Sequence, residues 1–502
     1  MKITFTIPSQ KDSYSFSHPG NQPPSAQQKK RFRLQIARRL PSHLLPLHAT
    51  LLSRNGLTIA ICGASQSGKS TLAKLLVTQG FTIHANDFIA VWENNQQLLA
   101  ADINYETENR TKKPLNVKHF IFLNPEDPRD IFTENLPYLI NLYSHTLPKL
   151  KVSLSLKNNS VFNQIYKHHL VLGNRQSPTR WFNLLDSHLL NPSPPTGRIG
   201  VIGLGSLGQH LTSLLVNQSN ITQLNLYSLN QDKLNSFILD LKSANPNQII
   251  HQQKCLEKVF THSDIVILTF RISNPTQASS TSNIRFQKLF DHVQALWPIT
   301  RAIRATQYQG RVLVVTNPVD PLSWSTYYLS NLNNSLKPDW TGLSSSQVIG
   351  VGLGLDHRRL QTLTNQPLEV IGEHGDNLLL AQYQNPSTLK PYSNQTLLSQ
   401  VLSYSDKIRQ HLPRTITGPA HETISLITHL LNSKHTPLRA SSLNQQGVFL
   451  GNILTYHSGI LGPSLIKSSS LQKLEEPVVL LHKQFQQKII QNIKKGAKLK
   501  EK

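Results

Sequence analysis

Three glycines, Gly203, Gly205 and Gly208, follow an apolar run that ends at Ile202 and open a helix-forming stretch. The pattern is GxGxxG. It constrains the fold because glycine is needed where the chain turns tightly and where the following helix packs closely on the strand. The N-terminus of such a helix presents backbone N–H groups that bind an anion. Because a second apolar run ends near Tyr227, the motif predicts a site for the pyrophosphate of a dinucleotide.

The chain around this motif alternates apolar runs with helical patterns, which predicts the α/β fold class with a doubly wound parallel sheet. The predicted strands have the sequences RIGVIG, ITQLNLYS, DIVILTF and RVLVVTNP. From about Val348 the alternation is less regular, as expected of a mixed α+β domain. The segment NPSPPTG interrupts any helix or strand. We therefore predict an N-terminal domain over 1–190, a linker over 191–197, a Rossmann domain over 198–347 and a C-terminal domain over 348–502.

Ser228, at the end of the second predicted strand, bears on the choice of dinucleotide. An acidic residue is usual at this position, where it binds the adenine-ribose hydroxyls of NAD and repels the 2′-phosphate of NADP. Serine lacks that charge, and the basic Lys233 follows closely in the sequence. The sequence therefore predicts NAD or NADP as the cofactor and leaves the choice between them open.

Four further segments, LNLYSLNQDKLNSFILDL, VVTNPVD, GLDHRRL and IGEHGD, occur in an order that resembles the lactate/malate dehydrogenase family. The resemblance runs from about Arg198 to about Asn492, and the last three segments are its most specific part. It implies a Rossmann domain followed by a mixed α+β catalytic domain. It also implies hydride exchange between NAD(P)H and a small 2-oxo or 2-hydroxy acid, and a homo-oligomer.

The resemblance gives each motif residue a role. His374 of GEHGD matches the proton donor and acceptor, which suits histidine because its pKa lies near working pH. Asp356 matches the carboxylate that orients this imidazole, and Arg359 matches the clamp for the substrate carboxylate. Asn317 of TNPVD matches a residue that binds the nicotinamide side of the cofactor and the substrate oxygen. Singly, such residues are also common in turns and surface ion pairs, but the ordered set favours the catalytic interpretation.

The loop after DIVILTF departs from the family because it is longer and lacks a common glycine. Arg285 best matches the loop arginine that polarises the substrate carbonyl, since its separation from Asn317 is close to the family's, and Arg271 is the alternative. The position that separates lactate-type from malate-type enzymes falls near Ser273 or Asn274. Neither residue matches a class, so the identity of the acid stays open.

The interval between Asp356 and His374 is shorter than the family's usual one. This leaves open whether the family's helix and strand lie between the two residues and whether its usual subunit contacts form. The shortening does not by itself prevent the Asp–His pairing.

Upstream, an apolar run and a helical run flank GASQSGKS, which fits the phosphate-loop pattern GxxxxGK[ST]. The backbone N–H groups of such a loop surround phosphates, its lysine contacts the β- and γ-phosphates, and its Ser or Thr contacts Mg²⁺. The sequence therefore predicts that Gly63, Gly68, Lys69, Ser70 and Thr71 bind ATP with Mg²⁺.

The segment from about His48 to Val91 resembles the P-loop domain of HPr kinase/phosphorylase-like proteins. On that resemblance Asp87 matches the second acid of an Asp-Asp pair, a candidate Mg²⁺ ligand or base, and His48 matches a histidine ahead of the loop. Asn86 replaces the first acid, and the downstream signatures of that family are not recognisable. Kinase activity and its phospho-acceptor therefore stay open.

Composition limits the compartment and the partners. The net charge of +24 attracts anions, but the basic runs KKRFRLQIARR and KKGAKLKEK come with no nucleic-acid-binding signature, so nucleic acid is not expected. Cys62 and Cys255 belong to no disulfide or zinc pattern, and no stretch is apolar enough for a membrane span. We expect a cytoplasmic oxidoreductase. The alternative is a regulatory or sensory protein that binds dinucleotide and ATP without turnover.

Overall fold

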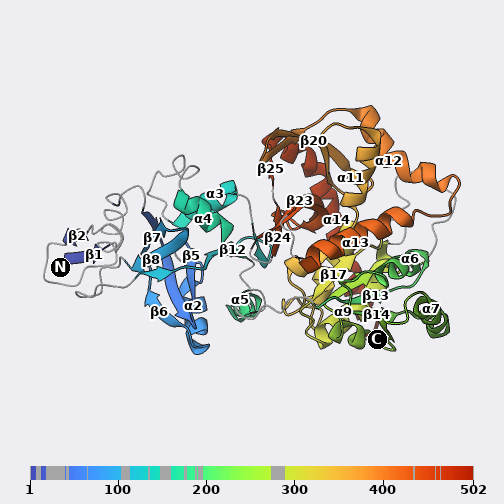
Figure 1. Ribbon diagram of the computed structural model, residues 1–502, viewed down its shortest axis with the longest axis horizontal. Coiled ribbons are helices and arrows are strands. Elements are labelled where there is room, and N and C mark those ends of the chain that lie inside the picture. Colours follow the sequence, from blue (N-terminus) through green and yellow to red (C-terminus); the bar gives the residue numbers. More distant parts are fainter. Residues whose placement is uncertain are drawn as a thin grey trace. The chain divides into compact units, whose positions relative to one another are not determined.

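The computed structural model describes residues 2–6, 13–17, 40, 44–64, 66–102, 114–133, 136–146, 160–173, 178–186, 189, 196–272, 289–432, 436–457, 460–463 and 465–500. The chain divides into two units, Met1–Leu189 and Leu190–Lys502 (Figure 1). The division falls beside the end of the predicted N-terminal domain at residue 190. Of the predicted linker over 191–197, only Thr196 and Gly197 are among the described residues.

Unit 1 contains one mixed sheet and one antiparallel sheet, which share an apolar core. A further two-stranded antiparallel sheet lies near the N-terminus of unit 1. Its strands are β1 (Lys2–Thr6), β2 (Ser13–Ser17), β3 (Leu45–Leu47), β4 (Ala49–Arg54), β5 (Leu57–Gly63), β6 (Thr82–Ala85), β7 (Ile89–Asn94), β8 (Gln97–Asp102), β9 (Leu115–Asn116), β10 (His119–Leu123), β11 (Ile131–Phe132) and β12 (His169–Leu172). Its helices are α2 (Lys69–Thr78), α3 (Leu136–Thr146), α4 (Ser160–Lys167) and α5 (Pro178–Leu185).

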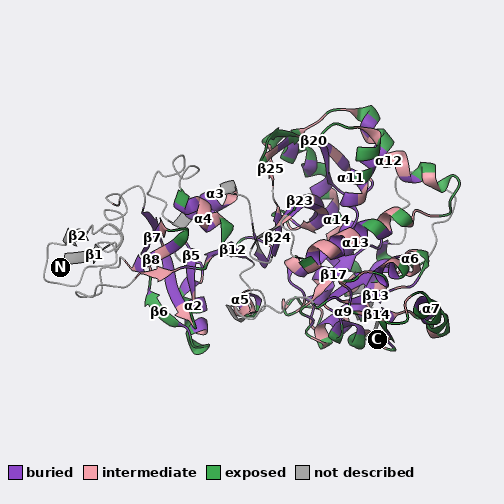
Figure 2. Ribbon diagram, viewed as in Figure 1, coloured by how far each residue is buried: buried purple, intermediate pink, exposed green. Residues whose placement is uncertain are grey.

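The larger sheet of unit 1 has six strands in the order β11-β12-β10-β5-β4-β6. Its strands β5, β10 and β12 are parallel, and β10 and β12 pair in register from Phe120↔His169 to Leu123↔Leu172. Nearly all their residues are buried, as Figure 2 shows by the purple colour of β5. Such continuous burial is typical of parallel strands covered on both faces. The second sheet, β3-β7-β8-β9, contributes to the same core.

One apolar run of unit 1 is divided in two. By its sequence pattern FTIHANDFIAVW is expected to form one strand, but it forms β6 and β7, which belong to different sheets. The break falls at Asn86 and Asp87, where Asp87 has a φ of 83°. This left-handed backbone is incompatible with a continuous strand.

The first half of unit 2 confirms the predicted Rossmann arrangement. Its strands are β13 (Arg198–Ile202), β14 (Gln223–Tyr227), β15 (Ile249–Gln252), β16 (Ile265–Leu268), β17 (Arg311–Val314) and β18 (Val348–Gly350), and its helices are α6 (Ser206–Leu215), α7 (Gln231–Ala244), α8 (Leu256–Thr261), α9 (Leu289–Ala305) and α10 (Val319–Ser330). The strands are parallel in the order β15-β14-β13-β16-β17-β18. This is the doubly wound order in which a ligand binds at the carboxyl ends of the strands.

The second half of unit 2 mixes antiparallel strands with helices. Its elements are α11 (Leu353–Leu363), β19 (Leu368–Gly372), β20 (Leu378–Asn385), β21 (Thr388–Pro391), α12 (Gln395–Arg409), α13 (Thr417–Asn432), β22 (Leu438–Leu443), β23 (Phe449–His457), β24 (Ile460–Pro463), β25 (Ile466–Lys467) and α14 (Ser469–Lys500). The two halves share one 13-stranded sheet, because β18 pairs with β22 at Gly350↔Ser441. The parallel sheet therefore extends past the predicted boundary at residue 348.

The short interval between Asp356 and His374 contains both a helix and a strand. Helix α11 continues to Leu363 and β19 begins at Leu368, so only a brief turn joins them. The shortening noted in the sequence therefore removes neither element. Within the described part of the chain, no helix has the length and apolar character needed to cross a membrane.

Candidate active site

The glycine turn between β13 and α6 has the packing that the motif predicts. A Cβ at Gly203, whose φ is 99°, would overlap the backbone of Phe270, and a Cβ at Gly208 would overlap the carbonyl oxygen of Gly203. Gly205 is different, because nothing lies within 4 Å of its ideal Cβ position. It is also the N-cap of α6. Two glycines therefore allow close packing, and the third leaves open space at a helix N-terminus, where an anion binds favourably.

Other predicted cofactor residues follow neighbouring parallel strands. Ser228 comes directly after β14, and Lys233 lies in the first turn of α7. Asn317 follows β17, is exposed, and leads into α10 through a cis peptide bond to Pro318. Since β13, β14 and β17 are parallel, their carboxyl ends lie at one edge of the sheet. Ser228 and Asn317 therefore follow strands on either side of the glycine turn.

His374, Asp356 and Arg359 form a buried constellation in the second half of unit 2. Nδ1 of His374 lies 2.6 Å from Oδ2 of Asp356, and Nη1 of Arg359 donates to Oδ1 of Asp356 at 3.0 Å. The exposed fractions of the three side chains are 8%, 1% and 7%. Asp356 and Arg359 lie on α11, one turn apart, and His374 follows β19. One carboxylate therefore binds an imidazole and a guanidinium at the same time.

Two neighbours of this constellation were not predicted from the sequence. The imidazole of His374 lies so close to Gly352 that any Cβ at this position would overlap the ring. The Cζ atom of Arg359 lies 5.8 Å from the ring centroid of Tyr404, on α12, which suits a cation–π contact. The signal for Gly352 was its place just before GLDHRRL. Tyr404 gave no sequence signal, because a single tyrosine on a helix is common.

A third missed residue is Asp320, the last residue of the segment TNPVD. The backbone N–H of His374 donates to Oδ2 of Asp320 at 2.9 Å. Asp320 is buried, and this burial raises the pKa of its carboxyl to about 6, with the nearby Glu373 raising it further and His482 lowering it. The carboxylate thus contacts the residue that carries the predicted proton relay.

The predicted residues of the loop after β16 lie outside the described residues. These are Arg285, Ser273 and Asn274. Arg271, the alternative to Arg285, is described and follows β16 closely. Burial and the neighbouring Arg414 and Arg409 lower the pKa of Arg271. The guanidinium groups of Arg409 and Arg414 therefore lie near that of Arg271.

In unit 1, the predicted phosphate loop joins β5 to α2. Nζ of Lys69 donates to the carbonyl oxygens of Gly63 at 2.8 Å and of Ala64 at 2.9 Å. Gly68 has a φ of 100°, and its ideal Cβ position lies 2.9 Å from the ring of Trp181 on α5. Ser70 and Thr71 are exposed in the first turn of α2. The lysine therefore folds back on its own loop, and the backbone of that loop needs glycine at residue 68.

His48 and Asp87 lie at the same edge of the unit 1 sheet as this loop. The N–H of Gly63 donates to the carbonyl oxygen of His48 at 3.4 Å, and Nε2 of His48 lies 3.5 Å from Oδ1 of Asp87. Asn86, which stands in place of the first acid, accepts from the hydroxyl of Thr50 at 3.1 Å. Among the described residues, no group of three or more His, Cys, Asp or Glu side chains is arranged to hold a metal ion.

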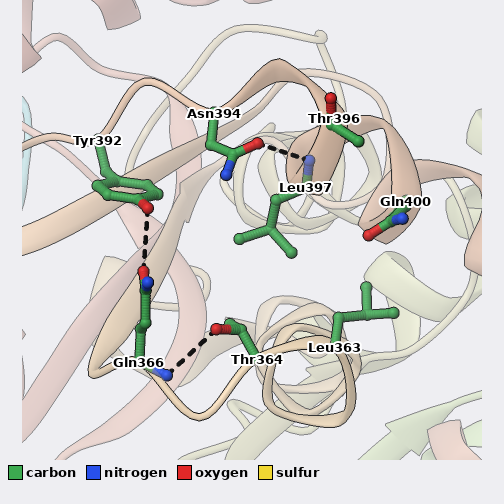
Figure 3. A pocket seen from close by; sticks show the side chains of 8 residues that line it. All are labelled: Leu363, Thr364, Gln366, Tyr392, Asn394, Thr396, Leu397 and Gln400. Atoms are coloured by element: carbon green, nitrogen blue, oxygen red, sulfur yellow. Dashed lines mark hydrogen bonds between the residues drawn. The ribbon is translucent and has the colours of Figure 1, made fainter.

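A cavity of about 220 Å³ lies elsewhere in unit 2, between the end of α11 and the start of α12 (Figure 3). There the Tyr392 hydroxyl donates to Gln366 at 2.9 Å and Asn394 caps α12 by accepting from the N–H of Leu397 at 2.9 Å. None of the predicted site residues lines this cavity. Its polar side chains bond to one another or cap the start of α12.

Comparison with known proteins agrees with the sheet and the glycine turn. Residues 197–339 match the family model of the lactate/malate dehydrogenase NAD binding domain. This region includes Gly203, Gly205, Gly208, Ser228 and Asn317. The prediction of a Rossmann domain that resembles the NAD binding domain of this family is therefore confirmed.

The relatives cover only part of the chain. The L-lactate dehydrogenase 1 of Staphylococcus aureus strains JH9 and Mu50 is 28% identical over 193 residues, which is 36% of this chain and 56% of the relative. The chain thus matches only about half the length of these curated relatives. A solved lactate dehydrogenase from a Medee basin deep-sea metagenome library is 17% identical and covers 59% of this chain and 99% of its own, with a TM-score of 0.49. Malate dehydrogenase of Archaeoglobus fulgidus, solved with NADH, is 17% identical and covers 58% and 99%, also with a TM-score of 0.49.

Proposed function

We propose that unit 2 is an NAD(P)-dependent 2-hydroxy-acid dehydrogenase of the lactate/malate type. The observation that carries the proposal is the buried set of His374, Asp356 and Arg359, with contacts of 2.6 and 3.0 Å to the shared carboxylate. A protein that only senses a dinucleotide has no need of an acid/base pair beside a buried guanidinium. This set therefore favours an enzyme over the regulatory alternative.

The residues at the sheet edge fit the dinucleotide. The space at Gly205 and the N-terminus of α6 suit its pyrophosphate, with Gly203 and Gly208 shaping the turn. Ser228 would bind the adenine ribose, and Asn317 the nicotinamide side. When bound, the dinucleotide supplies or accepts the hydride.

The buried constellation would perform the proton transfer in the reaction 2-oxo acid + NAD(P)H + H⁺ ⇌ 2-hydroxy acid + NAD(P)⁺. Asp356 accepts a hydrogen bond from Nδ1 of His374, which leaves Nε2 as the nitrogen that exchanges a proton with the substrate oxygen. The carboxylate stabilises the imidazolium form of this ring. Arg359 would bind the substrate carboxylate through its planar guanidinium, and Arg285 remains the proposed residue that polarises the carbonyl.

The test is turnover of a panel of 2-oxo acids. Pyruvate, oxaloacetate and branched 2-oxo acids are each offered with NADH and with NADPH, and nicotinamide absorbance is followed. We expect turnover of at least one acid, and His374→Asn should lower kcat far more than cofactor affinity, because it removes only the proton relay. Absence of turnover with every pair would favour the regulatory alternative. An unchanged kcat in His374→Asn would refute the acid/base role.

We also propose that Ser228 allows both cofactors. The Ser228→Asp variant should shift the ratio of kcat/KM values toward NADH, because an added carboxylate repels the 2′-phosphate. The ratio is measured in wild type and variant with the same acid. A wild type that already rejects NADPH, together with an unaltered ratio in the variant, would mean that residue 228 does not contact the ribose.

For unit 1 we propose binding of ATP with Mg²⁺ at the loop of Gly63, Gly68, Lys69, Ser70 and Thr71. Its support is the strand, loop and helix geometry, in which Lys69 is buried and in contact with the loop backbone. Lys69→Ala should abolish Mg²⁺-dependent ATP binding, measured by calorimetry, while dehydrogenase activity survives. Loss of both together would argue against separate sites.

Phosphotransfer from that ATP is a further proposal for unit 1. Asp87 would serve as Mg²⁺ ligand or base, and its left-handed backbone, with a φ of 83°, is typical of strained functional positions. Incubation with radiolabelled ATP and candidate acceptors tests this step, with Asp87→Asn as the matched variant. Equal labelling in wild type and variant would exclude Asp87 from it.

A further inference from the structure

A group of buried polar side chains lies beside the backbone of His374. Asp320, Glu373, His482 and Ser441 are each at most 3% exposed. Nε2 of His482 lies 3.3 Å from Oε1 of Glu373, and the N–H of His374 donates to Asp320. The side chain of Asn377 donates to Glu373. These residues come from α10, α14, β22 and the turn after β19, so the fold gathers them from distant parts of unit 2.

The charges in this group depend on one another. Asp320 and Glu373 are both buried carboxylates, and the like charge of Glu373 raises the pKa of Asp320. His482 opposes this effect, since its positive form attracts both carboxylates, and the hydroxyl of Ser441 also favours the ionised form of Asp320. The pKa of Asp320 is raised to about 6, chiefly by burial. Its protonation therefore changes within the range in which enzymes are assayed.

We propose that Asp320, whose charge state is set by the nearby Glu373 and His482, positions His374 through its backbone N–H. The positioning role in the reaction rests on the proposed dehydrogenase function. Ionised Asp320 is a strong acceptor for this N–H, whereas its protonated form is a weaker one. Protonation of Asp320 loosens the turn that holds the imidazole against Asp356.

The consequence for catalysis falls on the acidic side of the pH profile. In the direction of 2-oxo acid reduction the reaction consumes a proton, so the rate falls on the alkaline side. A loss of kcat/KM at acidic pH in this direction therefore reports a carboxyl group. Removing the charge of His482 should raise the pKa of Asp320 and move this loss of kcat/KM to higher pH. Removing the charge of Glu373 should lower that pKa and move the loss to lower pH.

The experiment compares His482→Gln, Glu373→Gln and the double variant in the full-length protein. We expect the acidic loss of kcat/KM to move up by about one pH unit in His482→Gln and down by about one unit in Glu373→Gln. The double variant, which replaces both charges with amides, should return close to wild type. The matched control is His429→Gln on α13, whose ring contacts Ser425 and Thr436 and should leave the profile unchanged.

A second measurement does not depend on turnover. The folded pKa of Asp320, about 6, lies above its unfolded value of about 4, so its contribution to stability is greatest below pH 4 and is lost as pH rises through 6. Tm is therefore measured across pH for wild type and each variant. The loss of stability that comes with ionisation of Asp320 should occur at higher pH in His482→Gln and at lower pH in Glu373→Gln than in wild type. A purely structural role would lower Tm equally at every pH.

Opposite shifts of the two single variants, with recovery in the double variant, support the inference. Shifts in the same direction, or none, while wild type turns over its substrate, overturn it and leave the proposed function intact. If wild type shows no turnover, the proposed function fails. The Tm profiles then decide by the same criterion whether Glu373 and His482 set the charge state of Asp320.

Discussion

Replacing Asp356 should impair both halves of the proposed site at once, because one carboxylate contacts the imidazole and the guanidinium. It is 1% exposed and accepts from both His374 and Arg359. In Asp356→Asn the shape of the side chain is kept, but the negative charge between two basic groups is lost. The imidazolium then has no carboxylate to stabilise it, and the guanidinium stays buried without this counter-charge. Both the proton relay and the proposed substrate clamp should suffer.

The size of the loss follows from the proton transfer that the pair supports. Proton transfer by a positioned side chain contributes about 10²–10⁴-fold to a rate. Losing it should lower kcat/KM by about 10²–10⁴-fold, which is about 3–5 kcal/mol of transition-state stabilisation at about 1.4 kcal/mol for each tenfold. The part that acts through His374 should appear in kcat, and the part that acts through Arg359 should appear as a higher KM. Cofactor affinity should change little, because the glycine turn is not altered.

The assay is steady-state oxidation of NADH with the acid that wild type reduces fastest, together with NADH binding followed by fluorescence. The matched control is Asp339→Asn, which removes another Asp–Arg pair of unit 2, with 2.8 Å between Asp339 and Arg304. This control should keep kcat/KM within about twofold, because the side chain of Asp339 contacts Arg304 and Thr341 and none of the predicted site residues. If Asp356→Asn also stays within about fivefold of wild type, the proton relay does not depend on this carboxylate and the reasoning fails.

Further predictions concern the glycines and a surface ion pair. Gly208→Ala should lower Tm in thermal unfolding, because the added Cβ overlaps the carbonyl oxygen of Gly203. Gly205→Ala should keep the Tm of wild type but lose dinucleotide affinity about tenfold or more in an NADH titration. Gly352→Ala should displace the active-site imidazole and lower kcat with unchanged NADH affinity, so an unaltered kcat would contradict the contact. Arg304 lowers the pKa of Asp339 to about 2, so this pair stabilises the fold above about pH 4 and its contribution disappears as pH falls through 2. The Tm difference between Asp339→Asn and wild type should therefore shrink between pH 4 and pH 2, and a constant difference would argue against the pair.

The Rossmann half could be predicted because its signals are local. A glycine motif between an apolar strand and a helix specifies its own backbone, and alternating strands and helices specify a parallel sheet. The order of GLDHRRL and IGEHGD pointed to His374, Asp356 and Arg359, and the structure brings these residues together. Their catalytic roles stay predictions.

What could not be predicted depends on contacts between distant residues. His482 lies far along the chain from Glu373, and nothing in the sequence around either residue indicates their contact. The break between β6 and β7 is hidden because the apolar pattern runs through it, while the positive φ of Asp87 depends on the surrounding sheets. The strand β18 lies just past the predicted boundary at residue 348, and its three residues are too few to give a clear periodic signal.

The pairing of β18 with β22 has a consequence for how unit 2 melts. One sheet crosses both halves, and one apolar core includes Ile202 and Val266 from the first half together with Phe449 and Ile489 from the second. Neither half can then lose its packing without exposing apolar surface of the other, so the two should unfold in a single cooperative step. A ligand that binds only the folded glycine turn stabilises every element in that step by mass action. Hydrogen exchange in α14 should therefore slow when a dinucleotide binds at the glycine turn.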